Sequence, residues 1–153
     1  TNTFLPLQTW RAIIGPETQR IYDCMKRLGV IINQHSCGKI ESLVGDIVKM
    51  GANILNPCQP CNDLAYLKKR YGDRLCFAGG IDSQFVLNRP GVTIEEVAEE
   101  VKRRIEDLAP GGGYIAMPSH DVPYDQAILH AMSEAIQKYG SYEKGLTNMR
   151  SAQ

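Results

Sequence analysis

Short apolar runs alternate with longer segments of helical periodicity along most of the chain. The runs predict buried strands at about 30–35, 53–56, 75–79 and 114–117. After each strand, apolar residues recur at i, i+3, i+4 and i+7, which predicts helices over 40–50, 62–71, 93–108 and 127–136. One more helix, over 16–28, precedes the first strand. A strand followed by a helix, repeated along the chain, is typical of an α/β fold with a parallel sheet.

Residues at the helix ends sharpen these boundaries. Pro16 suits the first position of the first helix, and Asn62 is a favourable N-cap for the third. Thr93 and Glu96 form a capping box. The first helix is expected to bury one apolar stripe, made of Ile21, Cys24, Met25 and Leu28. Burial in the core also accounts for Cys76, in the third strand.

Two architectures fit this order of elements. One is a small doubly wound sheet, and the other is part of a (β/α)₈ barrel. A whole barrel takes ~250 residues, so four strand-helix units correspond to half of one. The first helix has no strand before it, as a cut through the middle of a barrel would leave it. The pattern of elements leaves both architectures open, and after Gly140 it predicts a polar tail over 141–153.

Charge and composition exclude several classes of protein. The chain carries 17 Lys and Arg residues against 17 Asp and Glu residues, which excludes a basic nucleic-acid footprint and gives no case for an anionic membrane surface. No apolar run reaches the ~18 residues that a membrane span needs, and the first residues do not resemble a secretion signal. The five cysteines are an odd number, which favours reduced thiols in a cytoplasmic protein.

Candidate chemistry gathers where the predicted strands end. These strand-end loops are 34–38, 56–58, 79–82 and 118–121. Ligands bind at this edge of a parallel sheet. Imidazole and thiolate are the side chains that zinc prefers. His35, Cys37 and His120 could supply three zinc ligands, with Cys58 as a fourth.

Each of these signals also has a structural interpretation. A His-x-Cys pair alone binds nothing more often than not, and Cys58 with Cys61 forms a CxxC that also suits redox chemistry. The glycines before Asp82 admit a ligand to the backbone or simply make a turn. His130, within a helix, is expected to be solvated or packed. The three glycines at 111–113 precede a strand, so they belong to the opposite edge of the sheet.

As a set, four segments resemble the C-terminal half of the uroporphyrinogen decarboxylase superfamily in order and spacing. They are HSCG at 35–38, GANILNP at 51–57, RLCFAGGID at 74–82 and GGGYIAMPSHDVP at 111–123. Members of this superfamily are (β/α)₈ barrels of about twice this length or more. The resemblance therefore implies a fragment, the C-terminal half of such a barrel over 1–140. One branch decarboxylates uroporphyrinogen III in porphyrin biosynthesis without metal or cofactor, and its main catalytic residues lie in the other half of the barrel. The second branch transfers methyl groups to or from a corrinoid protein and uses zinc.

The zinc branch holds its metal by a His-x-Cys pair and a Cys from the last strand end. His35 and Cys37 match that pair, and His120 stands where the Cys is found. Cys58 falls near the place of a Glu zinc ligand in the related cobalamin-independent methionine synthases. The loop positions and the resemblance together imply catalytic roles for His35, Asp82 and His120. They imply substrate contacts by Asn56, Gly80 and Asp121.

We therefore expect a zinc-dependent methyltransferase or demethylase that acts on a small molecule with a corrinoid protein as partner. The alternatives are uroporphyrinogen III decarboxylase and a half-barrel that is inactive or serves as a binding module. Half a barrel leaves open sheet edges and a bare apolar face. We accordingly expect a homodimer or a complex with the missing N-terminal half, and neither nucleic acid nor membrane as a partner.

Overall fold

The computed structural model describes residues 3–141, and these residues form one layer of helices on one parallel sheet. The neighbouring strands pair in parallel and in chain order, β1-β2-β3-β4. In chain order the elements are α1 (Leu7–Arg27), β1 (Asn33–His35), α2 (Glu41–Met50), β2 (Ile54–Cys58), α3 (Leu64–Tyr71), β3 (Cys76–Ile81), the π-helical turn η1 (Ser83–Leu87), α4 (Ile94–Leu108), β4 (Tyr114–Pro118) and α5 (Gln126–Tyr139).

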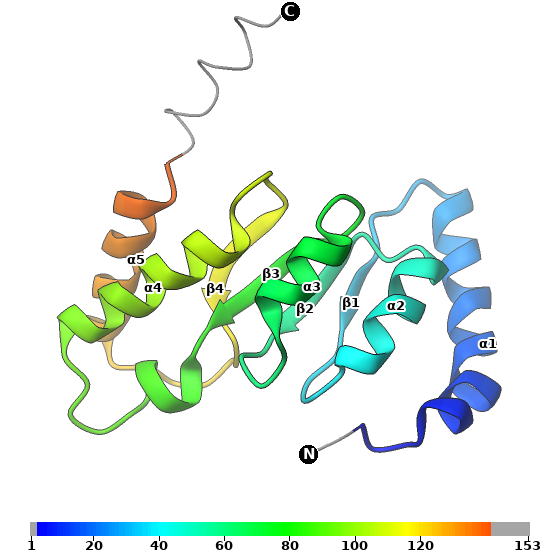
Figure 1. Cartoon of the computed structure of the whole chain (residues 1–153), viewed down its shortest axis with the longest axis horizontal. Coiled ribbons are helices and arrows are strands. Elements are labelled where there is room, and N and C mark those ends of the chain that lie inside the picture. The colour runs from blue at the N-terminus through cyan, green and yellow to red at the C-terminus, as the bar shows by residue number, and fades with distance from the viewer. Residues whose placement is uncertain (1–2, 142–153) are drawn as a thin grey trace, which may run out of the picture.

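The strand order decides between the two predicted architectures. A doubly wound sheet reverses its strand order and carries helices on both faces. Here the order never reverses, and each helix contacts the next one along the chain from α1 to α5 (Figure 1). The fold is therefore part of a (β/α)₈ barrel, as the sequence predicted.

The register separates a covered face of the sheet from a bare one. Paired residues of neighbouring parallel strands point to the same side, and successive residues alternate. Leu55, Phe77 and Tyr114 share one row and pack into the helix layer. Ile54 and Cys76 pair in the adjacent row, which points away from the helices. On this bare face, which would line the inside of a barrel, the side chain of Ile115 is 46% exposed.

The first helix differs from the prediction in length and in the face that it buries. It begins at Leu7, so Pro16 lies inside the helix rather than at its start. The buried face carries Tyr22, which donates to Gln34 of β1, together with the partly buried Met25. Ile21 and Cys24, expected inside, are exposed, and so is Leu28. Polar contacts such as Lys26 Nζ to the Met50 carbonyl, 2.8 Å, help to set this orientation, and a pattern of apolar residues does not register them.

The start of the first strand and the start of the third helix also differ from the prediction. The first strand is Asn33–His35, and of the apolar run before it only Ile32 is buried, while Val30 and Ile31 are exposed. The N-cap of α3 is Asp63, whose side chain accepts from the Tyr66 N–H. The capping box of Thr93 and Glu96 at the start of α4 is confirmed.

A buried lysine stabilises the end of the sheet that lies opposite the strand-end loops. Lys68 of α3 donates through Nζ to the carbonyl of Gly112, within the three-glycine turn that leads into β4. Gly111, Gly112 and Gly113 all have positive φ, a conformation that glycine adopts without steric cost. This contact holds the turn against α3 and away from the strand-end loops.

Other expectations concern the cysteines, the membrane and the tail. Cys76 is only half-buried because it lies on the bare face, so its predicted place in the core is wrong. His130 is exposed on α5, in agreement with the solvated interpretation.

Within residues 3–141, no helix combines the length and the apolar character that crossing a membrane requires. The predicted polar tail over 141–153 lies, beyond Ser141, outside the described residues.

Candidate functional site

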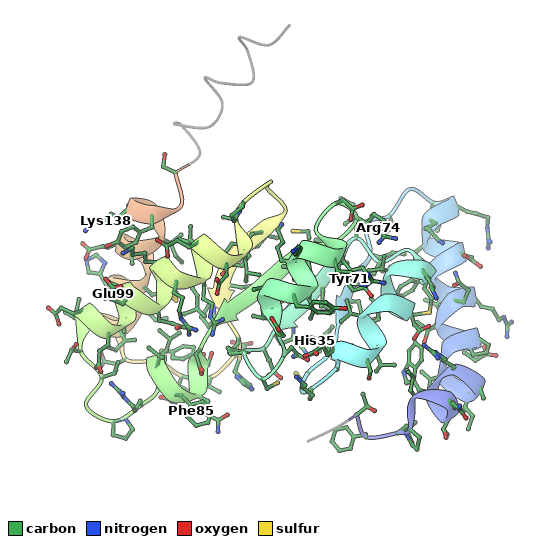
Figure 2. The ribbon with its side chains drawn as sticks, viewed as in Figure 1. His35, Tyr71, Arg74, Phe85, Glu99 and Lys138 are labelled. Carbon is green, nitrogen blue, oxygen red and sulfur yellow. The ribbon has the colours of Figure 1, made fainter. Side chains whose placement is uncertain are left out.

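The ends of β1, β2 and β4 open into one cavity of about 830 Å³. His35 and His120 both line it, which confirms that these strand-end loops share one edge of the sheet. In Figure 2, His35 lies at the same edge of the molecule as Phe85 of η1, while Arg74 and Lys138 lie toward the other edge. The cavity wall is largely apolar, formed by Pro57, Met117, Pro118, Val122, Pro123, Leu129 and Met132.

The His-x-Cys pair forms a close contact at the mouth of this cavity. His35 Nε2 lies 3.3 Å from Cys37 Sγ, and both side chains are exposed. His35 is the last residue of β1, and Gly38, with positive φ, turns the chain directly after Cys37. The two donors therefore converge because the strand ends there and the loop folds back on itself.

His120 faces the cavity from the loop after β4, and its ring is held on both sides. Its Nε2 lies 2.7 Å from Nε2 of Gln59, and its Nδ1 lies 3.4 Å from Oγ of Ser119. Gln59 is buried and comes from the loop after β2. The ring thus links two strand-end loops that are about sixty residues apart in the chain.

A small group of hydroxyls supports the loop below His120. The backbone N–H of His120 donates to Ser83 Oγ, 2.9 Å away. Tyr124 Oη lies 2.6 Å from the same oxygen and 2.7 Å from the His120 carbonyl. Ser119 Oγ accepts from the Ser83 N–H, and partial burial raises the pKa of Tyr124. At ordinary pH all of these groups are neutral, so the cluster positions His120 without placing a charge beneath it.

Asn56 and Asp121, both predicted to contact substrate, line the cavity. Asn56 sits beside His35 in the register of β1 and β2, and its side chain is half-buried. Asp121 is exposed and is the only carboxylate in the described lining, which contains no Lys or Arg. The described lining therefore carries one negative charge and no fixed positive charge.

The structure places Cys58 away from the cavity, contrary to the prediction. Its side chain is 1% exposed within the helix-side core, and its Sγ lies 3.4 Å from the Leu55 carbonyl. Burial raises the pKa of this thiol to about 12, so the thiolate that binds metal is disfavoured. A register irregularity between Leu55 and Cys58 changes which face the later residues of β2 point to, and this turns Cys58 inward.

Gly80 and Asp82 do not line the cavity either. A Cβ on Gly80 would meet Leu108 and Tyr114, so the absence of a side chain here allows the strand to pack closely against the helix layer. The Asp82 carboxylate accepts from the backbone N–H groups of Gln84 and Phe85, both at 2.9 Å, and caps η1. Asp82 therefore has a structural role, and its catalytic role stays a prediction.

The donor set can be compared with what zinc requires. Tetrahedral zinc with one sulfur and one nitrogen ligand separates them by roughly 3.5 Å, close to the 3.3 Å between Cys37 and His35. The pair therefore fits two zinc positions. His120 does not fit a third while Gln59 occupies its Nε2. Within residues 3–141, no group of three or more His, Cys, Asp or Glu side chains is arranged to hold a metal ion.

Sequence reasoning missed the residues that hold the site together, namely Gln59, Ser83, Ser119 and Tyr124. Gln59 and Ser119 lie directly after strands β2 and β4, so position alone could have marked them as candidates. Their partners could not be predicted, because a glutamine or serine in a loop has no preferred contact until the loops are placed in space.

Comparison with known proteins identifies the family. Residues 1–139 match the family described as uroporphyrinogen decarboxylase (URO-D). The chain is 31% identical over 113 residues to the methylcobamide:CoM methyltransferase MtaA of Methanosarcina barkeri, covering 71% of this chain and 32% of that protein. For MtaA of the Fusaro strain the identity is 30% over 115 residues, covering 69% and 33%.

A solved structure supports the fold. The methyltransferase from Methanosarcina mazei superposes with a TM-score of 0.72 at 16% identity, covering 90% of this chain and 39% of that one. The matched part spans about a third of the length of the curated relatives. Because the family match extends over nearly all of the described residues, and the fold is that of a partial barrel, the chain belongs to the uroporphyrinogen decarboxylase family.

Proposed function

We propose that this protein takes part in zinc-dependent methyl transfer between a corrinoid protein and a small molecule. The observation that carries the proposal is the contact of His35 Nε2 with Cys37 Sγ at the cavity mouth. The curated relatives, named as methylcobamide:CoM methyltransferases, support the same reaction class. We further propose a cytoplasmic location, on the basis of the unpaired thiols.

His35 and Cys37 would hold the zinc. When bound, zinc supplies Lewis acidity, which lowers the pKa of a substrate thiol or polarises a methyl ether oxygen. The apolar wall, including Met117 and Met132, would lower the polarity around the reacting group. Asn56 offers an amide donor and acceptor that can orient a polar substrate atom beside His35.

The proposal also assigns a partner to the bare face of the sheet. That face carries the exposed Ile115, and its outer strands β1 and β4 have free edges within the described chain. A second copy of this chain, or the N-terminal half of a barrel, would cover this side chain and these edges.

Zinc binding tests the proposal most directly. The chain, purified without chelators, is expected to contain stoichiometric zinc, and Cys37→Ser is expected to weaken binding by at least about tenfold in competition with a coloured chelator. Cys61→Ser is the matched control, because Cys61 is also exposed but lies outside the cavity.

Two outcomes would contradict the proposal. One is equal zinc affinity in the Cys37 and Cys61 variants. The other is metal-free protein, both as this chain and when it is joined to an N-terminal half.

Uroporphyrinogen III decarboxylase remains the second candidate, and the place of His120 favours it. In the decarboxylases that this chain resembles, a His at the last strand end contacts the substrate, and here His120 lines the cavity with its Nε2 occupied by Gln59. Turnover of uroporphyrinogen III without metal would support this candidate. A chain with neither zinc nor turnover would support a binding module.

A further inference from the structure

Gln59 is the residue that connects the two halves of the candidate site. It is 6% exposed, and its Oε1 accepts from the N–H of Gly38, the residue after Cys37. Its Nε2 lies 2.7 Å from His120 Nε2 and 3.4 Å from the Ser119 carbonyl. One buried amide therefore spans the loops after β1, β2 and β4.

The partners of this amide fix its orientation. A backbone N–H only donates, so the oxygen of Gln59 must face Gly38. A carbonyl only accepts, so the NH₂ group must face Ser119. His120 Nε2, on the same side as Ser119, must then accept a hydrogen bond from Gln59.

The tautomer of His120 follows from that hydrogen bond. A neutral imidazole that accepts at Nε2 carries its proton on Nδ1. That proton points toward Ser119 Oγ, 3.4 Å away, which can accept it because the Ser119 hydroxyl proton is directed to Ser83 Oγ at 3.3 Å. Both ring nitrogens are thus used within the protein, although the side chain is exposed and lines the cavity.

We propose that Gln59 is a positioning residue that holds His120 as a neutral Nδ1–H ring in the cavity wall, outside the coordination sphere of a metal bound by His35 and Cys37. The metal part of this inference rests on the proposed function. The remaining zinc positions are then left to the substrate and to groups outside residues 3–141. The tautomer part stands without any metal.

Nitrogen-15 NMR of the metal-free chain tests the tautomer at a pH of about 8, above the range in which histidine usually changes charge. The His120 signals, assigned by their loss in His120→Asn, are expected to show the Nδ1–H form. Gln59→Met removes both hydrogen bonds, and we expect the ring to shift toward Nε2–H. Gln59→Glu keeps the acceptor for Gly38 and removes the donor, so the same shift there would assign the effect to the His120 contact. An Nε2–H ring in the unmodified protein would overturn the inference.

Zinc affinity tests whether His120 is a ligand. We expect His120→Asn to bind zinc within about threefold of the unmodified chain, as His130→Asn does, while Cys37→Ser loses at least about tenfold. His130 is the matched control because it is an exposed histidine on α5, away from the cavity.

A tenfold loss in His120→Asn alone would make His120 a ligand and overturn the inference. If no variant and no unmodified protein binds zinc, the proposed function fails, and the tautomer measurement still decides the role of Gln59.

Discussion

Cys58 precedes Gln59 in the chain, yet the two side chains lie in different surroundings. Gln59 reaches across the strand-end loops, whereas the Cys58 thiol lies in the helix-side core with its pKa raised to about 12. Since the thiolate is the reactive form of cysteine, Cys58 is inert near neutral pH. The exposed Cys61, three residues further on, has no such protection.

Alkylation with iodoacetamide should therefore separate the two thiols. At about pH 8, native protein is expected to be modified at Cys61 and Cys37, while Cys58 reacts only after unfolding in urea. Raising the pH toward about 10 should not make Cys58 reactive in the folded chain, because that pH is still below its pKa of about 12. Peptide mass spectrometry reads the result, and equal labelling of Cys58 and Cys61 in native buffer would contradict the assignment.

For single residues, the sequence predicted the positions of site residues at the ends of strands with regular pairing. It failed where the pairing of a strand is irregular. His35, Cys37 and His120 could be placed at the cavity because each lies at a strand end or within two residues of one. Cys58 could not, since the irregularity in β2 reverses which face its residues point to, and no local signal in the sequence marks it.

Among the elements, the start of α2 is held by a residue from a different loop. The N-cap position of α2 is Ile40, which has no side-chain acceptor of its own. Asn62 Oδ1 accepts from the N–H groups of Ile40 and Glu41, at 2.9 and 3.1 Å. Its Nδ2 donates to the carbonyls of Gly38 and Gln59. The buried Asn62 thus replaces a local cap and fixes the loop that carries Cys37.

Substitution of Asn62 should destabilise the protein more than loss of an ordinary cap. Asn62→Ala removes a cap and leaves buried polar groups unpaired, so we expect a loss of about 2–3 kcal/mol in the free energy of unfolding. Asp63→Ala removes the exposed cap of α3 and should cost about 1 kcal/mol. Urea denaturation compares the two variants, and an equal effect would show that Asn62 acts only as a local cap.

The positions and buried faces of helices and strands could be predicted where the apolar residues of the sequence are the ones that the fold buries. The pattern located α4 well, because its buried residues include Val97, Val101, Ile105 and Leu108 and its capping box is local. It misplaced the buried face of α1, which is set partly by hydrogen bonds of Lys26 and Tyr22 to distant residues. Asn62 was identified as a cap, but the helix that it caps depends on tertiary structure.

At the scale of the whole molecule, the bare face of the sheet is the main surface on which apolar side chains lack packing partners. Ile115 is 46% exposed there, and burying large apolar side chains lowers the free energy of a complex. We expect the purified chain to associate, and light scattering at working concentration should report a mass above that of one chain. A strict monomer would count against this.

Charge placed on the bare face should reduce that association. Ile115→Asp is expected to shift the chain toward the monomer, because a carboxylate there would have to be desolvated in the complex. Ile94→Asp is the control, since Ile94 is similarly exposed but lies at the start of α4 on the helix layer. Equal association of both variants would place the contact elsewhere.

The uniform direction and order of the strands restrict the symmetry of any such dimer. The free edges belong to β1 and β4, which differ. Two copies that join edge to edge in parallel, with both bare faces turned to one interior, must therefore place β4 of one beside β1 of the other. A closed pair of this kind has a two-fold axis that runs along the barrel, between the two sheets. Both cavities then open at the same end, facing each other across that axis, and a single partner molecule approaching from that end would meet two sites at once.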